Sequence, residues 1–585
     1  MIFSRWSLLE DLHRAQILEY IDLYLALHFY EEKKFSSSVA SLFTYLYASC
    51  RRGFMRVRFD LGRLVPDPLQ WRRKEEEIPL LKRWIREIIQ GREELPSHWV
   101  TNISYRRNGQ QATTPLISFQ EALYFHAFWM REVKALSHLS RIFQGGHPIQ
   151  PSKRGLSVKE EERLATLLPE QRRVLWSIYN CGVTLLSGGP GTGKTYVVGS
   201  CLRLLESERY KRERAWRIAL CAPTGKAVFQ LQQSVQNQIS SPSPLHVEAQ
   251  TVHRLLLRKK GPHLQADFFF VDECSLLDSY WIEQLLSAIP NGAHLILSGD
   301  SFQLPSVGVG ALFNDFFSYS PLQREVPSPL FLHHSLRVEK NDLLPLFLSI
   351  RQGKVSQALH QIEKSSSIHF LNLQKGGEEE GQRKEWLLSL LASHLPSPQK
   401  LATMSFSQAF SLCTQFCFLS PIRQGVWGEE SLNRELLMHF LSSISEPMQI
   451  LIPISITQND SRLELFNGEM GFWRLLYHPH RPLQEQREGH FLLTLRNEQQ
   501  LYANLDKQVR EIPSALFANY AYTYGFSVHK SQGSEFDHVF FLLPETSRFT
   551  SRELLYTAIT RAKSELTLCA TPTTLKSTIE ISCQR

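Results

Sequence analysis

The feature that most constrains the fold is a glycine-rich stretch at residues 185–198, which reads LLSGGPGTGKTYVV. It follows an apolar run and precedes a segment with helical periodicity, so the pattern predicts a strand, a tight loop and a helix in that order. The spacing G-x-x-x-x-G-K-T lets consecutive backbone N–H groups wrap a polyphosphate at a helix N-terminus. An ordinary glycine-rich turn is the alternative, and the flanking patterns disfavour it. We therefore expect the chain to bind a nucleoside triphosphate.

Two side chains of this loop have predicted roles of their own. Lys194 is expected to reach the β and γ phosphates of ATP, and the Thr195 hydroxyl is expected to ligate Mg²⁺. Upstream, Gln171 in the segment LPEQRRVLW is placed to contact the edge of adenine. ATP and Mg²⁺ are thus the predicted cofactors, and the predicted ATP-binding residues are Gln171, Gly188, Gly189, Pro190, Gly191, Thr192, Gly193, Lys194 and Thr195.

The case for hydrolysis rests on a second apolar run, in FFFVDECSLLD, which ends in Asp272 and Glu273. One carboxylate after such a strand can hold Mg²⁺, and the second can orient or deprotonate the attacking water. Two acids that merely open a helix are the structural alternative. Together with the phosphate loop, the acid pair predicts an ATPase.

Further apolar runs, in VTLLSG, RIALCAPTG, DFFFVDE and HLILSGD, each end in a small or acidic residue before a helical segment. This alternation predicts an α/β fold with a parallel sheet, and ligands bind at the carboxyl edge of such sheets. Gln303 follows the last run, where its amide can sense the γ phosphate. Arg561, far downstream, can supply a cation to the transition state, although a lone arginine is more often a solvated side chain.

Composition excludes several other classes. A chain of 585 residues is too long to fold around a single hydrophobic core, so several domains are expected. The net charge of +8 permits a polyanionic partner without requiring one. The nine cysteines are odd in number and form no C-x-x-C pairs, which argues against a disulfide framework or a zinc site. Apolar runs long enough to span a membrane are missing, so we expect a soluble, cytoplasmic protein.

The order of these patterns along the chain predicts the domains. Helical periodicity fills the first part, and a Gly/Pro-rich segment near residues 145–155 is the best linker. A proline-rich region of low order is expected from residue 346, and short β-like runs between residues 446 and 514 suggest a small barrel. The predicted boundaries are 1–110 (helical, partner docking), 111–155 (helical connector), 156–345 (first α/β domain, ATP site), 346–445 (second α/β domain, first part), 446–514 (β insertion) and 515–585 (second α/β domain, second part).

Several motifs occur in the order found in superfamily 1 DNA helicases of the RecD type, the alpha subunits of exodeoxyribonuclease V, and the chain resembles that family. The motifs are SGGPGTGKT, APTGKA, TVHRLL, VDECSLLD, GDSFQLPSVGVG, FNGEMG, VHKSQGSEFD and LLYTAITRA. The resemblance implies two RecA-like P-loop NTPase domains, with a small SH3-like β-barrel insertion and a helical N-terminal domain. It also implies that ATP binds between the RecA-like domains and that single-stranded DNA crosses them.

The resemblance assigns further roles by motif. It implies Lys194, Asp272, Glu273, Gln303, Arg337 and Arg561 as the catalytic set, with Thr195 and Asp272 as the Mg²⁺ ligands. Contacts to DNA should go mostly to phosphate and sugar, with little sequence preference and a clear salt dependence. The implied DNA-binding residues are Pro223, Thr224, Gly225, Lys226, Thr251 and His253 on one domain, and Ser527, His529, Lys530 and Ser531 on the other.

The implied activity is an ATP-dependent 5′-to-3′ single-stranded DNA translocase and helicase. It would be the motor subunit of a helicase–nuclease complex that processes double-strand breaks for recombinational repair. Its partners would be single-stranded DNA, duplex DNA ends, and RecB-like and RecC-like subunits in a heterotrimer. The sequence shows no cluster of acids with a nearby lysine that would form a nuclease site, so nuclease activity is expected in a partner.

Three alternatives to this activity stay open. The segment between TVHRLL and DFFFVDE is short, which favours translocation without strong unwinding by the chain alone. A regulatory or scaffolding subunit that uses ATP only as a switch is a second function class, although the intact acid pair and both arginines favour a motor. An RNA helicase of the same superfamily is a third, because contacts to phosphate do not distinguish RNA from DNA.

Overall fold

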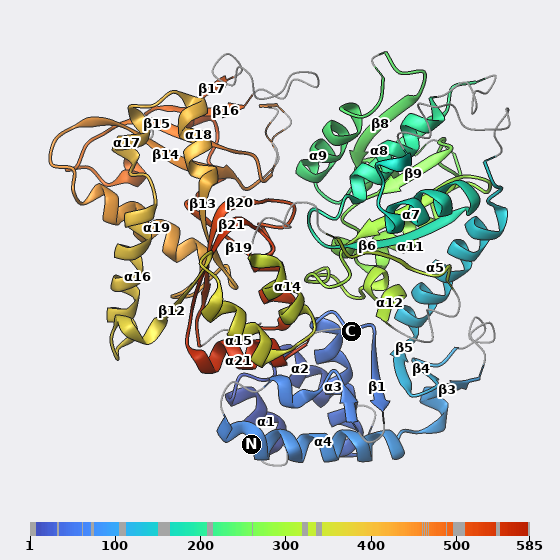
Figure 1. Cartoon of the computed structure of the whole chain (residues 1–585). Helices are drawn as coiled ribbons and strands as arrows, with labels where there is room; N and C mark the ends of the chain where they lie inside the picture. Colours follow the sequence, from blue (N-terminus) through green and yellow to red (C-terminus); the bar gives the residue numbers. More distant parts are fainter. Residues whose placement is uncertain are drawn as a thin grey trace. The chain divides into compact units, whose positions relative to one another are not determined.

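The structure is a computed structural model of the chain, and its two compact units, Met1–Arg337 (first unit) and Val338–Ser582 (second unit), are described separately (Figure 1). None of the described helices is long and apolar enough to cross a membrane. The described residues are 7–31, 34–60, 63–71, 75–104, 113–149, 164–206, 214–240, 242–259, 261–318, 326–334, 342–458, 460, 462–463, 465, 467–486, 488–494, 509–545 and 550–582, except for the side chains of a few residues at segment ends.

The centre of the first unit is a six-stranded sheet in which every described pairing is parallel. The four apolar runs predicted as strands are confirmed, and the α/β class with them. Every residue of β6 and β10 is buried, as expected for strands covered on both faces. In spatial order the strands are β11 (Leu330–Leu332), β6 (Val183–Gly188), β10 (His294–Gly299), β9 (Phe268–Val271), β7 (Arg217–Ala222) and β8 (His246–Thr251).

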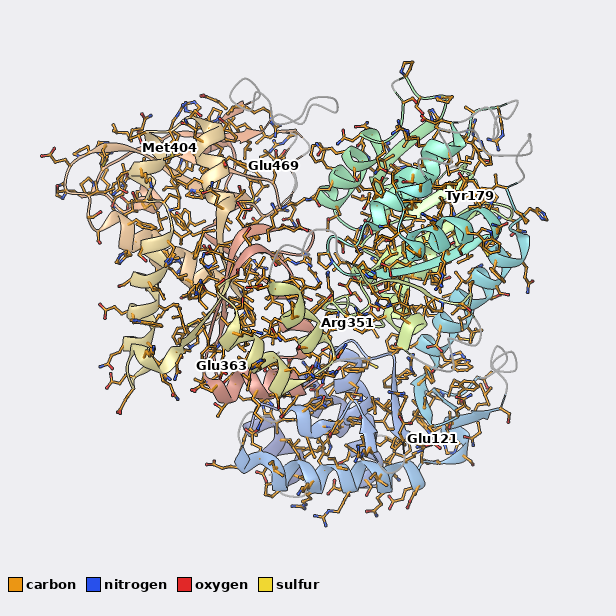
Figure 2. All side chains as sticks on the ribbon, in the orientation of Figure 1. Glu121, Tyr179, Arg351, Glu363, Met404 and Glu469 are labelled. Carbon is orange, nitrogen blue, oxygen red and sulfur yellow. The ribbon has the colours of Figure 1, made fainter. Side chains whose placement is uncertain are left out.

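Alternate side chains of each strand enter the hydrophobic clusters on opposite faces of this sheet. Phe268 and Phe270 belong to one cluster, and Phe269 and Val271 to the other, because successive strand side chains point to opposite faces. Tyr179 on one covering helix donates a hydrogen bond to the carbonyl of Cys201 on the next, at 2.9 Å (Figure 2). The first face is covered by α7 (Pro169–Asn180), α8 (Lys194–Leu205) and α9 (Gly225–Gln236), and the second by α5 (His126–Gly145), α11 (Ser279–Ala288) and α12 (Leu312–Ser318), while the short α10 (Val252–Leu257) packs beside α11.

The N-terminal region contains a mixed five-stranded sheet besides its helices, so the predicted helical N-terminal domain is not confirmed as such. Its strands have three to five residues each, too few for a clear alternation of polar and apolar positions. The pairing of β1 with β5 joins residues on both sides of the predicted boundary at residue 110. The helices are α1 (Ser7–Arg14), α2 (Tyr20–Glu31), α3 (Ser37–Arg51) and α4 (Ile78–Glu93), and the strands in spatial order are β2 (Arg63–Val65), β1 (Arg56–Asp60), β5 (Ala122–Phe125), β4 (Leu116–Phe119) and β3 (Val100–Ile103).

A buried ion cluster fixes this N-terminal sheet to the larger one. Arg56 on β1 is paired with Glu132 on α5 at 2.9 Å and with Asp315 on α12 at 3.1 Å, and all three side chains are almost fully buried. Tyr124 donates to the same Glu132 carboxylate at 3.3 Å. Since α5 also lies in the core of the larger sheet, the two sheets are parts of one folded body.

Loss of the Arg56 cation should destabilise the first unit strongly. Arg56→Met leaves two buried carboxylates without their cation, and breaking a buried pair in this way costs about 3–5 kcal/mol. The matched control is Arg58→Met on the same strand, whose partner Asp60 is 3.6 Å away and half-exposed, so its loss should cost less than about 1 kcal/mol. Urea unfolding followed by far-UV circular dichroism compares the two midpoints. Equal midpoints would contradict the assigned role of Arg56.

The second unit has a five-stranded sheet that is parallel throughout its described pairings. The prediction of a low-order region from residue 346 is wrong, because five α-helices, a short 3₁₀ helix and a strand occupy the chain up to Gln415. In spatial order the strands are β12 (Ile368–Asn372), β21 (Ala562–Ala570), β20 (Phe536–Leu543), β13 (Phe416–Ser420) and β19 (Gly525–Ser527), and the helices are α14 (Leu343–Arg351), α15 (Val355–Lys364), α16 (Glu380–His394), α17 (Pro398–Ala402), α18 (Phe406–Gln415), α19 (Glu429–Leu441), α20 (Arg552–Ile559) and α21 (Pro572–Glu580).

The predicted β insertion is an antiparallel five-stranded sheet, and its SH3-like barrel form is not confirmed. Ile450, Ile452 and Ile454 on its longest strand share one hydrophobic cluster with Leu436 of α19 and Phe540 of β20, so the insertion and the second α/β sheet have a common core. In spatial order its strands are β17 (Val509–Pro513), β16 (His490–Thr494), β15 (Met470–Tyr477), β14 (Met448–Ile456) and β18 (Tyr520–Tyr522).

Candidate nucleotide site and nucleic-acid loops

The glycine-rich loop joins the end of β6 to the start of α8. Gly191 and Gly193 have φ angles of 73° and 83°, in the left-handed region that a residue with a Cβ rarely adopts. Gly193 is also the N-cap of α8, so the first N–H groups of the helix open toward the loop. The Lys194 ammonium donates to the carbonyls of Gly188 at 2.6 Å and Gly189 at 3.3 Å. The loop therefore gathers a cation and unpaired helix N–H groups at one point, which suits a polyphosphate.

Gln171 is hydrogen-bonded to the phosphate loop. Its side chain is buried, its Oε1 accepts from the Leu168 N–H at 3.0 Å, and its Nε2 donates to the Thr192 carbonyl at 3.2 Å. Both ends of the amide are thus engaged within the first unit. The contact with adenine that the sequence predicted for Gln171 stays a prediction.

The acid pair follows β9, two strands away from the loop. Asp272 Oδ1 accepts from the Ser298 hydroxyl at 2.9 Å and from the Glu273 N–H at 3.0 Å. No described residue forms a hydrogen bond with the second oxygen, Oδ2. Glu273 has a φ of 53°, which is uncommon for a residue with a side chain, and strain of this kind clusters at functional sites.

Gln303 lies on the loop after β10, the strand between β6 and β9. It is buried, its Nε2 donates to Asp300 Oδ2 at 3.2 Å, and its Oε1 has no hydrogen-bond partner among the described residues. The hydroxyls of Ser187 and Ser301 lie 2.9 Å apart, which ties the end of β6 to this loop. The loop carrying Gln303 is therefore fixed to the strand that leads into the phosphate loop.

The donor set fits a nucleotide with a magnesium ion. The Oδ2 atom of Asp272, to which no described residue donates a hydrogen bond, and the half-buried Thr195 hydroxyl are hard oxygen ligands, the type that Mg²⁺ prefers. Clusters of three or more His, Cys, Asp or Glu side chains with metal-ligand spacing do not occur in the described segments. Asp272 and Thr195, together with the nucleotide phosphates, would suit a Mg²⁺ ion.

The loops predicted to bind nucleic acid in the first unit begin helices at the carboxyl edge of the sheet. Thr224 is the N-cap of α9 and Thr251 the N-cap of α10, and each accepts a hydrogen bond from the first turn of its helix. Gly225 and Lys226 are exposed, and Pro223 is half-buried. The His253 ring lies 4.0 Å from the Trp281 ring, and burial lowers the pKa of His253, so its imidazole is neutral at pH 7.

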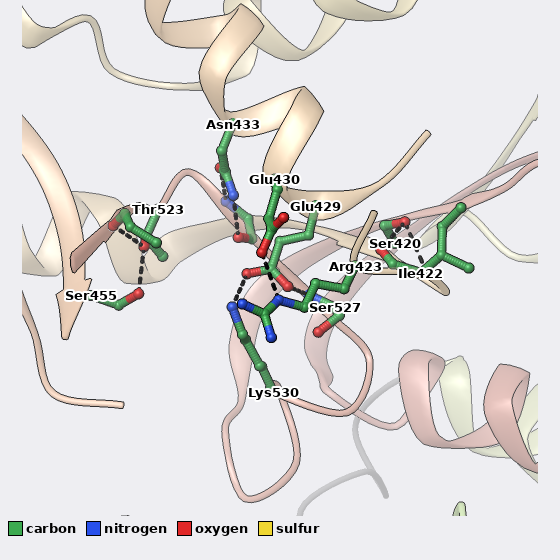
Figure 3. Close-up of polar contacts among 12 residues, drawn as sticks. Ser420, Ile422, Arg423, Glu429, Glu430, Asn433, Ser455, Thr523, Ser527 and Lys530 are labelled. Atoms are coloured by element: carbon green, nitrogen blue, oxygen red, sulfur yellow. Dashed lines mark hydrogen bonds and ion pairs between the residues drawn. The ribbon is translucent and has the colours of Figure 1, made fainter. Parts of the chain in front are cut away.

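The corresponding loop of the second unit is bound to α19 through Glu429 (Figure 3). Its buried carboxylate accepts from the Ser527 N–H at 2.8 Å and from the Lys530 ammonium at 2.6 Å. The side chains of Ser527 and Ser531 are buried, and the Ser531 hydroxyl donates to the Val528 carbonyl at 2.8 Å. Of the four residues predicted here, only His529 and Lys530 are exposed.

Comparison with known proteins now adds to this geometry. Residues 166–373 match the AAA domain family, and residues 522–569 match the UvrD-like helicase C-terminal domain family. The RecBCD enzyme subunit RecD of Mycobacterium tuberculosis is 28% identical over 83% of this chain and 82% of its own length. The subunit of the same name from Haemophilus influenzae is 27% identical over 79% of both chains. This chain is a RecD-like helicase of superfamily 1.

Two further similarities are more limited. The ATP-dependent RecD2 DNA helicase of Deinococcus radiodurans is 27% identical over 68% of this chain and 48% of its own length. A Bacteroides Pif1 bound to single-stranded DNA is 16% identical over 70% of this chain and 93% of its own, with a TM-score of 0.38, too low to support a conclusion. The family models and the sequence relatives identify the RecD-like helicase as an ATP-hydrolysing DNA helicase.

Two residues of the helicase that the sequence analysis did not single out, Glu429 and Asn433, hold the Lys530 loop in the second unit. Asn433, one turn after Glu429 on α19, accepts from the N–H groups of Tyr524 at 2.7 Å and Gly525 at 3.0 Å and donates to the Gly525 carbonyl at 3.0 Å. Glu429 and Asn433 thus hold the backbone that leads into the Lys530 loop. The available signal was their i, i+4 spacing in WGEESLN, since residues four apart lie on one helix face.

The two predicted arginines of the helicase differ in what the structure shows. Arg561 is buried, its Nε donates to the Thr557 carbonyl at 3.0 Å, and one Nη donates to the Ser534 carbonyl at 3.4 Å. It therefore connects α20 to the loop that carries Lys530. Arg337 lies outside the described residues. The catalytic roles of both arginines stay predictions.

Gly193→Ala should abolish tight nucleotide binding by the helicase. An added Cβ would lie 2.6 Å from Gln171 Nε2, and the left-handed backbone costs roughly 1–2 kcal/mol with any Cβ. The loop or Gln171 must then move, and we expect at least a tenfold loss of affinity for a fluorescent ATP analogue in a titration. Gly292→Ala is the matched control, because its φ is 82° but its Cβ would have no neighbour nearer than 3.9 Å. Loss of binding in the control alone would contradict this assignment.

Proposed function

We propose that this helicase is a 5′-to-3′ single-stranded DNA translocase and the motor subunit of a helicase–nuclease complex that processes double-strand breaks for recombinational repair. The observation that carries the motor is the joint placement of the phosphate loop, the intact acid pair and Gln303 at adjacent strand ends, connected by the Ser298–Asp272 and Ser187–Ser301 contacts. Relatives named as RecBCD subunits, similar over about four fifths of this chain, support its place in a complex.

The proposed chemistry assigns one role to each group of the first unit. Lys194 binds the β and γ phosphates, and Thr195 and Asp272 would hold Mg²⁺. The ion would neutralise charge that develops on the phosphates during hydrolysis. Glu273 orients the attacking water and accepts its proton, and Gln303 responds to the γ phosphate through its side-chain amide N–H group. Arg337 and Arg561 are proposed to complete the catalytic set.

The proposed DNA contacts are mostly to phosphate and sugar. The exposed side chains of Thr224, Lys226 and Lys530 are the strongest candidates, and Lys530 would exchange its Glu429 partner for a phosphate. The buried Ser527 and Ser531 would act by shaping the loop. Pro223, Gly225, Thr251, His253 and His529 complete the proposed set, and binding should weaken as salt rises.

The partners belong to the same proposal. RecB-like and RecC-like subunits would join the chain in a heterotrimer, and nuclease activity would come from one of them. The N-terminal residues 1–110 would dock on these partners, and the antiparallel sheet of the second unit would be the SH3-like insertion of the family. Single-stranded DNA and duplex ends are the proposed substrates.

The first test measures ATP hydrolysis by the purified chain with and without single-stranded DNA. We expect strong stimulation by DNA in the wild type and a loss of at least 100-fold in Lys194→Gln and in Glu273→Gln, because each variant removes a group needed for phosphoryl transfer. Glu273→Gln should still bind a fluorescent ATP analogue, which shows that its site is folded. Unstimulated hydrolysis by a folded chain that binds ATP would favour the regulatory subunit instead.

Polarity is tested with two duplexes that carry the same single-stranded tail at the 5′ or the 3′ end. A 5′-to-3′ motor loads on the 5′ tail and moves toward the duplex, so only this substrate should be unwound. Streptavidin displacement from biotin placed at either end of a single strand gives the same answer without requiring unwinding. Activity directed toward the 5′ end would refute the proposed polarity.

A further inference from the structure

A cavity of about 630 Å³ lies in the first unit beside β7 and the edge strand β8, and none of the proposed roles uses it. Its walls come from the start of these two strands, from the end of α10 and from the segment that leads into β9. It runs over the face of the strands that carries His246, Glu248 and Gln250, which alternate along β8. The sheet thus forms the floor of the cavity, and the ends of strands and of α10 form its rim.

The end of the cavity that carries Arg217 lies away from the carboxyl edge of the sheet, where the ATP and DNA loops lie. Arg217 opens β7 at the cavity, and Ala222 ends the same strand just before the Pro223 loop. The two residues are five positions apart along the strand, which corresponds to about 16 Å. The Arg217 end of the cavity therefore lies away from the Pro223 loop, while Gln250, next to Thr251, lines the opposite end.

Cations dominate the rim. Arg214, Arg217, Arg258 and Lys259 line the cavity, and Glu248 is the single acid among its lining residues. Arg214 is held by Asp267 in a bidentate pair at 2.9 and 2.6 Å. Arg217, Arg258 and Lys259 form no ion pair with any acid in the described segments. These three exposed cations give the cavity a positive charge that its own neighbours leave uncompensated.

The floor of the cavity has apolar side chains and a hydrogen-bond acceptor, neither of which would bind an inorganic anion. Ala219, Leu255 and Phe269 supply apolar surface, and the Oε1 atom of Gln250 is buried without a hydrogen-bond partner among the described residues. A ligand that matches the whole cavity carries negative charge toward the rim and apolar surface with a hydrogen-bond donor toward the floor. A nucleotide chain has this combination, with phosphates, sugars and base amino groups.

We propose that this cavity is a second DNA-binding site, which holds the phosphate backbone of a substrate strand apart from the path at the carboxyl edge. The helicase brings DNA to this same folded body, and cations from separate segments suit a backbone that repeats its charge at intervals. Two sources have this chemistry, the single-stranded tail and the duplex arm of the substrate. The site would add affinity and salt dependence without adding sequence preference.

The test compares the double variant Arg258→Ala/Lys259→Ala with the wild type in the full-length chain. The control is Lys82→Ala/Arg83→Ala, which removes the same charge from the exposed face of α4. The two probes are a fluorescein-labelled single strand and a duplex with the same strand as a 5′ tail, and Kd is measured by anisotropy over a series of KCl concentrations. ATPase activity at saturating single-stranded DNA serves as the readout of the primary site.

We expect the cavity variant to bind at least fivefold more weakly at low salt, and its log Kd against log[KCl] slope to fall by about 1 for each phosphate that the variant no longer neutralises. The control and the saturated ATPase rate should match the wild type. Weakening of both probes assigns the single-stranded tail to the cavity, and weakening of the tailed duplex alone assigns the duplex arm. Either result supports the proposal.

Wild-type Kd and salt slope for both probes in the cavity variant would overturn the proposal. Arg217→Gln provides a second variant from a different wall of the cavity and should show the same change in slope. A fluorescent oligoglutamate peptide gives the competing outcome. If it binds the wild type, loses affinity in the cavity variant, and DNA binding stays intact, the cavity recognises an acidic protein segment rather than DNA.

Discussion

The parallel pairing of β10 with both β6 and β9 is the constraint on which the nucleotide site depends. The register places Gly299 beside Ser187 and Leu297 beside Val271, so the three strands end within three residues of one another. The phosphate loop, the acid pair and the Gln303 loop therefore follow neighbouring strands at the same edge of the sheet. Hydrogen bonds then fix them, from Ser298 to Asp272 and between Ser187 and Ser301. The last residue of β10 has no room for a side chain, because a Cβ on Gly299 would lie 2.8 Å from the Phe313 ring.

The N-terminal region packs against the same sheet instead of forming a separate module. Its helix α5 lies in the same hydrophobic cluster as β6, β9 and β10, and Arg56 connects β1 to Asp315 on α12. The Gly310 N–H, on the segment between Gln303 and α12, donates to the Gly53 carbonyl at 2.9 Å. A partner that binds the N-terminal region would thus act on the body that holds Gln303.

The sequence predicted the first unit better than the second. The strands around the phosphate loop are continuous apolar runs, as required of strands buried on both faces, and each matches a strand of the structure. The short strands of the N-terminal sheet were missed because three to five residues give no reliable period. The helices after residue 346 were missed because prolines suggested disorder, although in α17 the proline stands at the first helical position, where it is tolerated.

The sequence by itself determined the chemistry of this helicase, because the phosphate loop and the acid pair depend on residue types at fixed local spacing. Only the tertiary structure decided which side chains are free to act. Gln171 donates a hydrogen bond to the Thr192 carbonyl of the phosphate loop, Lys530 is paired with Glu429, and Arg561 donates to backbone carbonyls. It also decided that cations from two separate segments, residues 214–217 and 258–259, meet in one cavity. Such contacts join residues far apart in the chain, and local spacing does not encode which distant strands and helices pack together.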